Sequence, residues 1–288
     1  MQPSAAEQAV LDAVSTRFAQ QDPEAEALSG GLGNRCWRLR DAGRDLVVRF
    51  GAAHAGAFGV DRRDELLAHS VAAGHGLAPE VLWHEAATGL LVTEFVPGRI
   101  WSRDEARRPA SVARCGAWLR ALHGLPVPEG IAHVDFGARA IELGEALPPD
   151  KFPAPLRVCA ALQRRRLGGT TIPVLCHHDL HHLNIVDTGP RLVVLDWEYA
   201  GAGEPLMDLA GYAAYHDLNE AAVAALLAAY AGSEPPACRE RFAAARWLFE
   251  CVWLLWLETR RITEGSESAE LAATRRHLAA RLGATPGG

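Results

Sequence analysis

Residues 177–184 bring together the side-chain types that acid–base and metal chemistry need. The run reads His-His-Asp-Leu-His-His-Leu-Asn, so the Asp179 carboxylate and the Asn184 carboxamide lie five positions apart in a polar loop between two short apolar runs. A second carboxylate, Asp196, follows Asn184 by twelve residues, at the end of the second run. Two such oxygen donors, completed by phosphate oxygens and water, suit Mg²⁺, which takes few protein carboxylates in octahedral geometry. Asp179 then remains to accept a hydroxyl proton.

The spacing of these residues resembles the catalytic loop of the protein-kinase-like fold, His-x-Asp-x-x-x-x-Asn followed by a metal-binding Asp. Residues 195–201 (Leu-Asp-Trp-Glu-Tyr-Ala-Gly) and 205–210 (Pro-Leu-Met-Asp-Leu-Ala) extend the resemblance to the aminoglycoside phosphotransferase and choline kinase superfamily. Within that superfamily the chain is most similar to bacterial choline kinases and thiamine kinases.

The resemblance implies a role for each matching residue. Asp179 would be the catalytic base, and Asn184 and Asp196 would be the magnesium ligands. His177 would orient the loop, and Asp208 matches an acidic position that braces the C-terminal lobe in this family.

The N-terminal third agrees with the resemblance. A glycine-rich turn, residues 29–34, lies where such kinases cover the ATP phosphates with backbone N–H groups. The resemblance implies that Arg49 replaces the phosphate-contacting lysine of most kinases and that Glu65 is its ion-pair partner. A guanidinium still binds phosphate, and the chain has one lysine against 28 arginines. The implied nucleotide-binding residues are Gly30, Gly31, Gly33, Asn34, Arg49, Glu65 and, at the hinge, Glu94.

Two tryptophans on one predicted helix near the C-terminus are relevant to the choice of phosphoryl acceptor. Trp253 and Trp256 are three residues apart and share a helix face. Either they pack in the core, or they surround a cation through their ring faces. The resemblance favours the cation site, because choline kinases place tryptophans around a quaternary ammonium in this region. Glu250 would add a negative charge, and Glu198 completes the predicted acceptor-binding set.

The apolar pattern predicts a small α+β lobe followed by a larger, mainly helical lobe, and the resemblance implies that together they form an α+β, two-lobed protein-kinase-like fold. Residues 1–97 are expected to form a small nucleotide-binding lobe with an antiparallel sheet, and residues 98–288 a larger, mainly helical catalytic and acceptor-binding lobe. Apolar spacing and turn residues predict helices over 5–20, 61–73, 110–122, 155–167, 204–216, 220–231, 236–261 and 269–282. Strands are predicted over 36–40, 45–50, 80–85, 90–95, 173–176 and 191–195, and an irregular stretch over 124–155.

Composition excludes several classes of protein. With 288 residues, 49% hydrophobic and 22% charged, the chain is an ordinary globular protein that can bury a large core. A net charge of −6 argues against a nucleic-acid partner. The six cysteines lack a C-x-x-C pair, the N-terminus lacks signal-peptide order, and the longest apolar run, 247–257, is too short to span a bilayer. We expect a cytoplasmic protein without a membrane partner; the oligomeric state is left open.

The resulting hypothesis is an enzyme that transfers the ATP γ-phosphoryl group, with Mg²⁺, to a hydroxyl of a small and cationic alcohol. Choline or a related amino alcohol is the first candidate and thiamine the second. Aminoglycosides come third, because enzymes acting on polycationic sugars present many acidic groups. A catalytically silent nucleotide-binding relative is an alternative that the retained Asp179, Asn184 and Asp196 oppose. A zinc hydrolase using the histidines at 177, 178, 181 and 182 is another, although their spacing is not that of the H-E-x-x-H motif.

Overall fold

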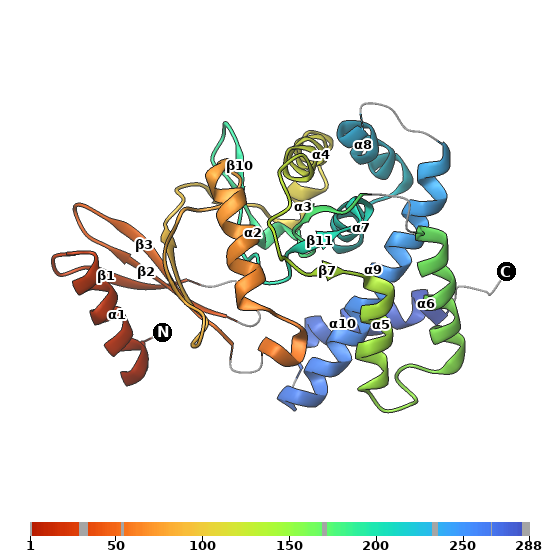
Figure 1. Cartoon of the computed structure of the whole chain (residues 1–288), viewed down its shortest axis with the longest axis horizontal. Helices are drawn as coiled ribbons and strands as arrows, with labels where there is room; N and C mark the ends of the chain where they lie inside the picture. Colours follow the sequence, from red (N-terminus) through yellow and green to blue (C-terminus); the bar gives the residue numbers. More distant parts are fainter. Residues whose placement is uncertain are drawn as a thin grey trace. The chain divides into compact units, whose positions relative to one another are not determined.

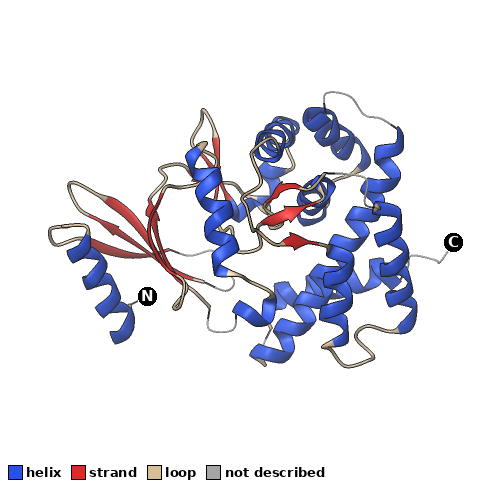
Figure 2. Ribbon diagram, in the orientation of Figure 1, coloured by secondary structure: helices blue, strands red, loops and turns tan. Residues whose placement is uncertain are grey.

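The computed structural model describes residues 2–28, 34–52, 55–168, 172–231, 236–265 and 267–283. Contacts divide the chain into two compact units, the first made of Met1–Ser102 with His182–Ala200 and the second of Arg103–His181 with Gly201–Gly288. An antiparallel sheet dominates the first unit and helices dominate the second, which confirms the predicted α+β class (Figure 2). The functional division at residue 97 stays a prediction.

The first unit is built on a five-stranded antiparallel sheet in the order β1-β2-β3-β5-β4. Its strands are β1 (Glu24–Leu28), β2 (Arg35–Arg40), β3 (Asp45–Phe50), β4 (Val81–Glu85) and β5 (Leu90–Glu94). Helix α1 (Ala5–Arg17) begins at Ser4, whose side chain and that of Glu7 form a reciprocal capping box. Leu11 and Val14 of this helix pack with buried residues of the sheet, Trp37, Leu39, Leu46, Val48, Leu90 and Val92.

The two-residue period of β3 decides which side chains point away from that core. Val48 is buried in the cluster with α1, so its neighbour Arg49 projects from the opposite face of the sheet. Helix α2 (Arg62–Gly74) follows the short helix η1 (Ala55–Phe58) and lies on this second face (Figure 1). Asp61 caps α2 by accepting hydrogen bonds from the backbone N–H groups of Arg63 and Asp64.

A small antiparallel sheet, ordered β10-β9-β6, completes the first unit. It contains β6 (Arg99–Ile100), β9 (Ile185–Asp187) and β10 (Leu192–Val194), and the short helix η2 (His182–Asn184) leads into β9. The Val194 N–H donates to the carbonyl of Leu77, just after α2, at 2.8 Å. This contact fixes the end of β10, where Asp196 follows, to the rest of the first unit.

The second unit packs its helices around α9 (Pro236–Glu264), which contacts α5 (Phe136–Glu145), α6 (Ala154–Leu167), α7 (Pro205–Tyr215) and α10 (Ala269–Gly283). Helices α3 (Arg103–Ala106), α4 (Pro109–His123) and α8 (Glu220–Ala231) complete the helical set, with α4 packed on α8 (Figure 1). A small sheet, ordered β7-β11-β8, holds β7 (His133–Val134), β8 (Val174–Cys176) and β11 (Gly201–Gly203).

The structure contains a helix and several strands that the sequence did not predict. Helix α5 lies inside the stretch 124–155 that the Pro and Gly content marked as irregular; Asp135 caps it by accepting from the Ala138 N–H at 3.0 Å. Strands β1, β6, β7, β9 and β11 were also not predicted, because most of them are two or three residues long and depend on partners distant in the chain. No helix in the described ranges is long and apolar enough to cross a membrane.

Candidate active site

The predicted catalytic segment, residues 177–184, begins where β8 ends, and one buried carboxylate holds its backbone. Asp208 on α7 accepts the N–H groups of His177, at 2.9 Å, and His178, at 2.6 Å. His178 has a φ of 64°, a left-handed conformation that non-glycine residues adopt at a cost. The Asp179 N–H donates to Nδ1 of His177 at 3.2 Å, which is the contact that a loop-orienting histidine would make.

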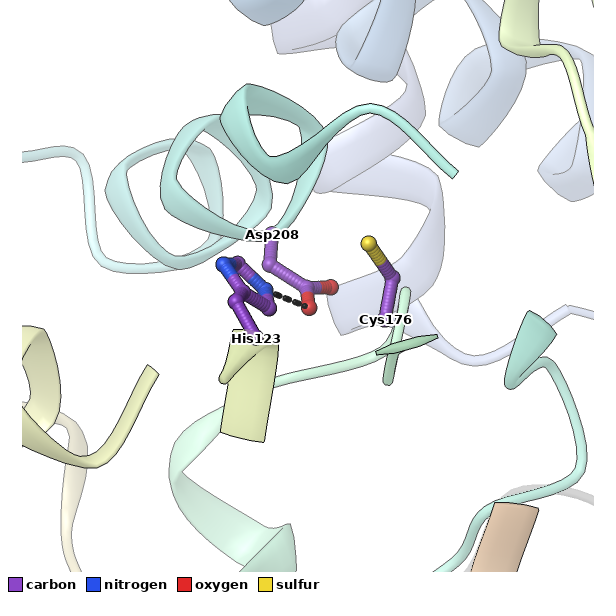
Figure 3. Close-up of side chains that lie close together, drawn as sticks. All are labelled: His123, Cys176 and Asp208. Carbon is purple, nitrogen blue, oxygen red and sulfur yellow. Dashed lines mark hydrogen bonds and ion pairs between the residues drawn. The ribbon is translucent and has the colours of Figure 1, made fainter. Parts of the chain in front are cut away.

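The Asp208 carboxylate belongs to a fully buried group shown in Figure 3. His123 Nε2 lies 3.0 Å from Oδ2 of Asp208, and His123 Nδ1 lies 2.9 Å from the hydroxyl of Tyr230. Burial alone would raise the pKa of Asp208, but the hydrogen bond from His123 and the neighbouring histidines outweigh it and hold that pKa well below its usual range. Burial and the Asp208 charge together raise the pKa of the Cys176 thiol.

This group is a hydrogen-bonded brace for the loop. In the described part of the chain, His123, Cys176 and Asp208 are the one trio of potential metal ligands whose atoms lie within 4.8 Å of one another. Both Asp208 oxygens already accept hydrogen bonds. The histidines at 177, 178, 181 and 182 form no such cluster, so the structure offers no support for the zinc hydrolase alternative.

Asp179, the predicted base, is anchored by a residue that sequence reasoning missed. The hydroxyl of Tyr215, the last residue of α7, donates to Oδ1 of Asp179 at 2.6 Å. The other oxygen, Oδ2, lies 3.7 Å from Nε2 of His181. The Asp179 side chain remains 16% exposed, so a solvent-borne hydroxyl can reach this carboxylate.

The predicted acceptor-binding residues of α9 fall in three different environments. Trp253 is partly exposed and meets the Tyr215 ring edge-on, with centroids 4.6 Å apart, so it lies next to the residue that holds Asp179. Trp256 carries the guanidinium of Arg260 over its ring, 5.5 Å from the centroid. Glu250 is buried, with Oε1 3.0 Å from Arg246 and 2.9 Å from Arg281. Its charge is therefore matched within the protein, and Trp253 is linked to Asp179 through Tyr215.

Strand register brings the backbones of the predicted magnesium ligands close to each other in the first unit. Ile185 pairs with Val194 across β9 and β10, and the Leu195 N–H continues the ladder by donating to the Asn184 carbonyl at 2.8 Å. Asn184 therefore lies beside the residue that precedes Asp196. Asp196 itself has a φ of 58°, a left-handed conformation that non-glycine residues adopt at a cost.

Arg49 connects Asp196, a predicted metal ligand, to α2. It forms an ion pair with Glu65, and its Nη1 lies 3.3 Å from Oδ1 of Asp196. Burial lowers the pKa of Arg49, but the charges of Glu65 and Asp196 outweigh that effect and leave it raised. Burial alone would raise the pKa of Glu65. The neighbouring arginines, Arg49 first and then Arg62, outweigh burial and lower the pKa of Glu65 below its ordinary value. Arg49 therefore stays charged.

Arg62 is a second cation of this network that sequence reasoning missed. Its Nη1 lies 2.7 Å from Oε2 of Glu65 and 3.2 Å from Oε2 of Glu198. Its position three residues before Glu65 on a helix was the available signal. Asn34 adds Nδ2, 2.9 Å from Oε2 of Glu198 and 3.4 Å from Oδ1 of Asp196. Glu198, predicted to bind the acceptor, thus contacts Asn34 of the predicted nucleotide-binding set and Arg62.

The remaining predicted nucleotide-binding residues are Glu94 and three glycines of the glycine-rich turn. Glu94 is exposed at the end of β5, where its N–H donates to the Glu80 carbonyl at 3.0 Å. The three glycines at 30, 31 and 33 lie outside the described residues.

The donor set of the first unit fits a hard divalent cation. Asn184 and Asp196 offer oxygen ligands, and Glu198 offers a further carboxylate beside them. Such oxygen donors suit Mg²⁺ and do not favour the softer transition metals. The metal itself and the role of each ligand stay predictions.

The fold and these two sets of side chains define a class, the kinase-like enzymes that phosphorylate small molecules. Comparison with known proteins identifies the family. Residues 24–242 match the model of the phosphotransferase enzyme family, and the chain belongs to that family.

Several solved structures are similar in fold to this chain. A choline/ethanolamine kinase family protein from Mesorhizobium loti is 28% identical, with a TM-score of 0.77 over 95% of this chain and 94% of its own. Choline kinase LicA from Streptococcus pneumoniae has the same fold at 18% identity, with a TM-score of 0.78 over 97% and 99% of the two chains. A complex of LicA with AMP, at 17% identity, gives a TM-score of 0.77 over 98% and 99%.

A curated relative matches over a shorter region. Protein LicA of Haemophilus influenzae is 29% identical over 92 residues, which is 30% of this chain. The match spans about a third (34%) of that relative's length.

Proposed function

We propose that the protein transfers the γ-phosphoryl group of ATP to the hydroxyl of a cationic amino alcohol, with choline as the first candidate. The observation that carries the proposal lies in the second unit, where Tyr215 touches both the Asp179 carboxylate and the Trp253 ring. An alcohol whose ammonium rests on an exposed aromatic face would thereby have its hydroxyl near a proton acceptor. Similarity to a choline/ethanolamine kinase family protein and to a choline kinase supports this acceptor class.

In the proposed reaction Asp179 takes the proton of the acceptor hydroxyl. The acceptor oxygen forms a bond to the γ-phosphorus as the bond from that phosphorus to the bridging oxygen of ADP breaks, and ADP leaves with that electron pair. Asp208 and His177 hold the backbone on which Asp179 stands. Trp253 orients the acceptor, and Tyr215 lies between Trp253 and Asp179.

The nucleotide would be bound by the first unit. Arg49 and Arg62 supply two cations for the phosphates, and their ion pairs with Glu65 keep both side chains in place. Asn184 and Asp196 would hold Mg²⁺, which when bound neutralises the charge that develops on the phosphoryl oxygens. Five positions separate Asp179 from Asn184, so one short loop carries the acceptor-side base and a nucleotide-side ligand.

Thiamine is the second acceptor candidate, since its thiazolium is also a cation that an aromatic face attracts. Aminoglycosides are less favoured. Glu250, the acidic residue predicted on this helix, is matched by Arg246 and Arg281 and adds no net charge for a polycationic sugar. A cytoplasmic location also stays a prediction.

An ATP-consumption screen against choline, ethanolamine, thiamine, aminoglycosides and simple sugars tests the proposal. We expect choline or a close amino alcohol to raise ADP release well above the rate with water alone. Replacing Trp253 by Leu should then raise the acceptor KM several-fold and leave the ATP KM unchanged, because the ring face is lost and the predicted nucleotide-binding residues of the first unit are not altered. Trp247→Leu is the matched control: this buried tryptophan lies on the same helix, so its replacement should lower stability without changing the acceptor KM.

Failure of every alcohol to accelerate ADP release would refute the proposed function. An unchanged acceptor KM in the Trp253 variant would remove the cation site and leave phosphotransfer standing.

A further inference from the structure

Helix α7 presents two polar side chains to the catalytic segment, two helical turns apart. Asp208 lies in its first turn and Tyr215 is its last residue, and a separation of seven positions puts both on one face. Asp208 accepts the backbone N–H groups of His177 and His178. Tyr215 donates to the side chain of the next residue, Asp179. One helix face therefore fixes both the backbone and the carboxylate of this segment.

The Tyr215 ring has little freedom to move its hydroxyl. Phe249 meets it edge-on at 5.1 Å and 83°, Trp253 at 4.6 Å and 68°, and His181 at 5.4 Å and 81°. These contacts require α7 and α9 to approach closely, and Gly211 permits it, since a Cβ at this position would lie 2.6 Å from the Phe249 ring. A tyrosine held in this way keeps its hydroxyl at a defined point.

We propose that Tyr215 is a positioning residue for phosphoryl transfer, and that its hydroxyl sets the orientation of the Asp179 carboxylate before the acceptor binds. The proposal rests on the proposed function and names the residue that makes its base effective. A carboxylate rotates easily about its terminal torsion, which has broad minima. A hydrogen bond to Oδ1 from a donor fixed by three rings removes that freedom. Proton acceptance then starts from a single geometry, as rapid transfer requires.

Tyr215 also couples the acceptor's contact with Trp253 to the orientation of the Asp179 carboxylate. The Trp253 ring packs against Tyr215, so a change at Trp253 also disturbs the support of Asp179. A residue that only filled space between α7 and α9 would need its ring and not its hydroxyl. The hydroxyl therefore separates the positioning role from a packing role.

The test compares two Tyr→Phe substitutions on the same helix. Tyr215→Phe keeps the ring contacts and removes the hydrogen bond to Asp179. Tyr212→Phe is the control, because its buried hydroxyl donates to the Ala106 carbonyl at 2.6 Å, away from the catalytic segment. Both variants are assayed with ATP and with whichever of choline, ethanolamine or thiamine the parent phosphorylates fastest.

We expect Tyr215→Phe to lower kcat by roughly ten- to a hundred-fold, with the KM values for ATP and acceptor within two-fold of the parent. Tyr212→Phe should lower the melting temperature and keep kcat within two-fold. In an Asp179→Asn background, Tyr215→Phe should have no further effect on kcat, since the group that it positions has lost its function.

Four results overturn the proposal. Equal kcat for the two Tyr→Phe variants removes the positioning role, and so does a full additional loss in the Asp179→Asn background. A rise in acceptor KM at unchanged kcat makes Tyr215 a binding residue instead. A parent protein that phosphorylates none of the acceptors refutes the proposed function, and with it this role; that failure is distinct because it appears before any substitution is made.

Discussion

Replacing Asp208 by Asn removes the charge of the brace without changing its volume. Oδ2 accepts from His123 and from the His177 N–H, and Oδ1 accepts from the His178 N–H. In either amide orientation the Asn side chain presents an NH₂ group to at least one of these donors. At least one hydrogen bond to a charged acceptor, worth about 1.5–3 kcal/mol, is lost, and a buried donor is left unsatisfied at a cost of about 1–3 kcal/mol.

These contributions predict that Asp208→Asn lowers the free energy of unfolding by about 3–5 kcal/mol. The melting temperature should fall by roughly 6–10 °C for a chain of this size. Urea unfolding followed by circular dichroism measures the effect. The matched control is Asp217→Asn, whose half-exposed carboxylate lies 3.4 Å or more from its arginine partners, and it should cost less than about 1 kcal/mol.

The same substitution should also reduce kcat at a temperature where the variant is fully folded, because the backbone below Asp179 is no longer held. Equal unfolding free energies for the Asp208 and Asp217 variants would refute the bracing role. Loss of stability at parental kcat would confine Asp208 to a structural role.

The stability that Asp208 contributes should depend on pH in a defined direction. Its pKa is lowered in the folded protein, so the unfolded chain binds the proton more readily. The contribution is therefore complete above the unfolded pKa of about 3.9 and is lost as the pH falls below that value. We expect the stability difference between parent and Asp208→Asn to be constant near neutral pH and to shrink below about pH 4. An unchanged difference at pH 3 would contradict this assignment.

Substitutions at three further residues test the other predicted roles. Asp179→Asn should leave ATP binding near that of the parent and lower kcat by at least about a hundred-fold, as expected for a lost proton acceptor, and turnover at the parental rate would exclude that role. Asp196→Ala should abolish the dependence of ATP affinity on Mg²⁺ while the protein stays folded; titrations with and without the metal measure it, and a parent whose affinity ignores magnesium would contradict it. Arg49→Lys should raise the ATP KM less than Arg49→Ala does, because Lys keeps a charge near Asp196; Ala kinetics equal to those of the parent would reduce Arg49 to a structural ion pair.

The sequence determines the features that depend on local periodicity and spacing. The order Asp179, Asn184, Asp196 lies within eighteen positions, so the loop and hairpin that carry these residues follow from the chain itself. Alternation along β3 turns Arg49 away from the core that buries Val48, and helical spacing brings Arg62 near Glu65. Periods of 2 and 3.6 residues are set by the backbone, which is why these relations can be inferred without the tertiary structure.

Only the tertiary structure decides which distant side chains meet. Tyr215 reaches Asp179 across 36 positions, His123 reaches Asp208 across 85, and Arg62 reaches Glu198 across 136. Glu250 illustrates the consequence, since a carboxylate that sequence spacing assigned to the acceptor is matched by Arg281 from another helix. Helix α5 formed where glycine and proline content predicted a loop, because its capping residue and its packing against α9 outweigh local composition. Such partners depend on how helices pack, and the packing free energy is shared among many residues that no short motif contains.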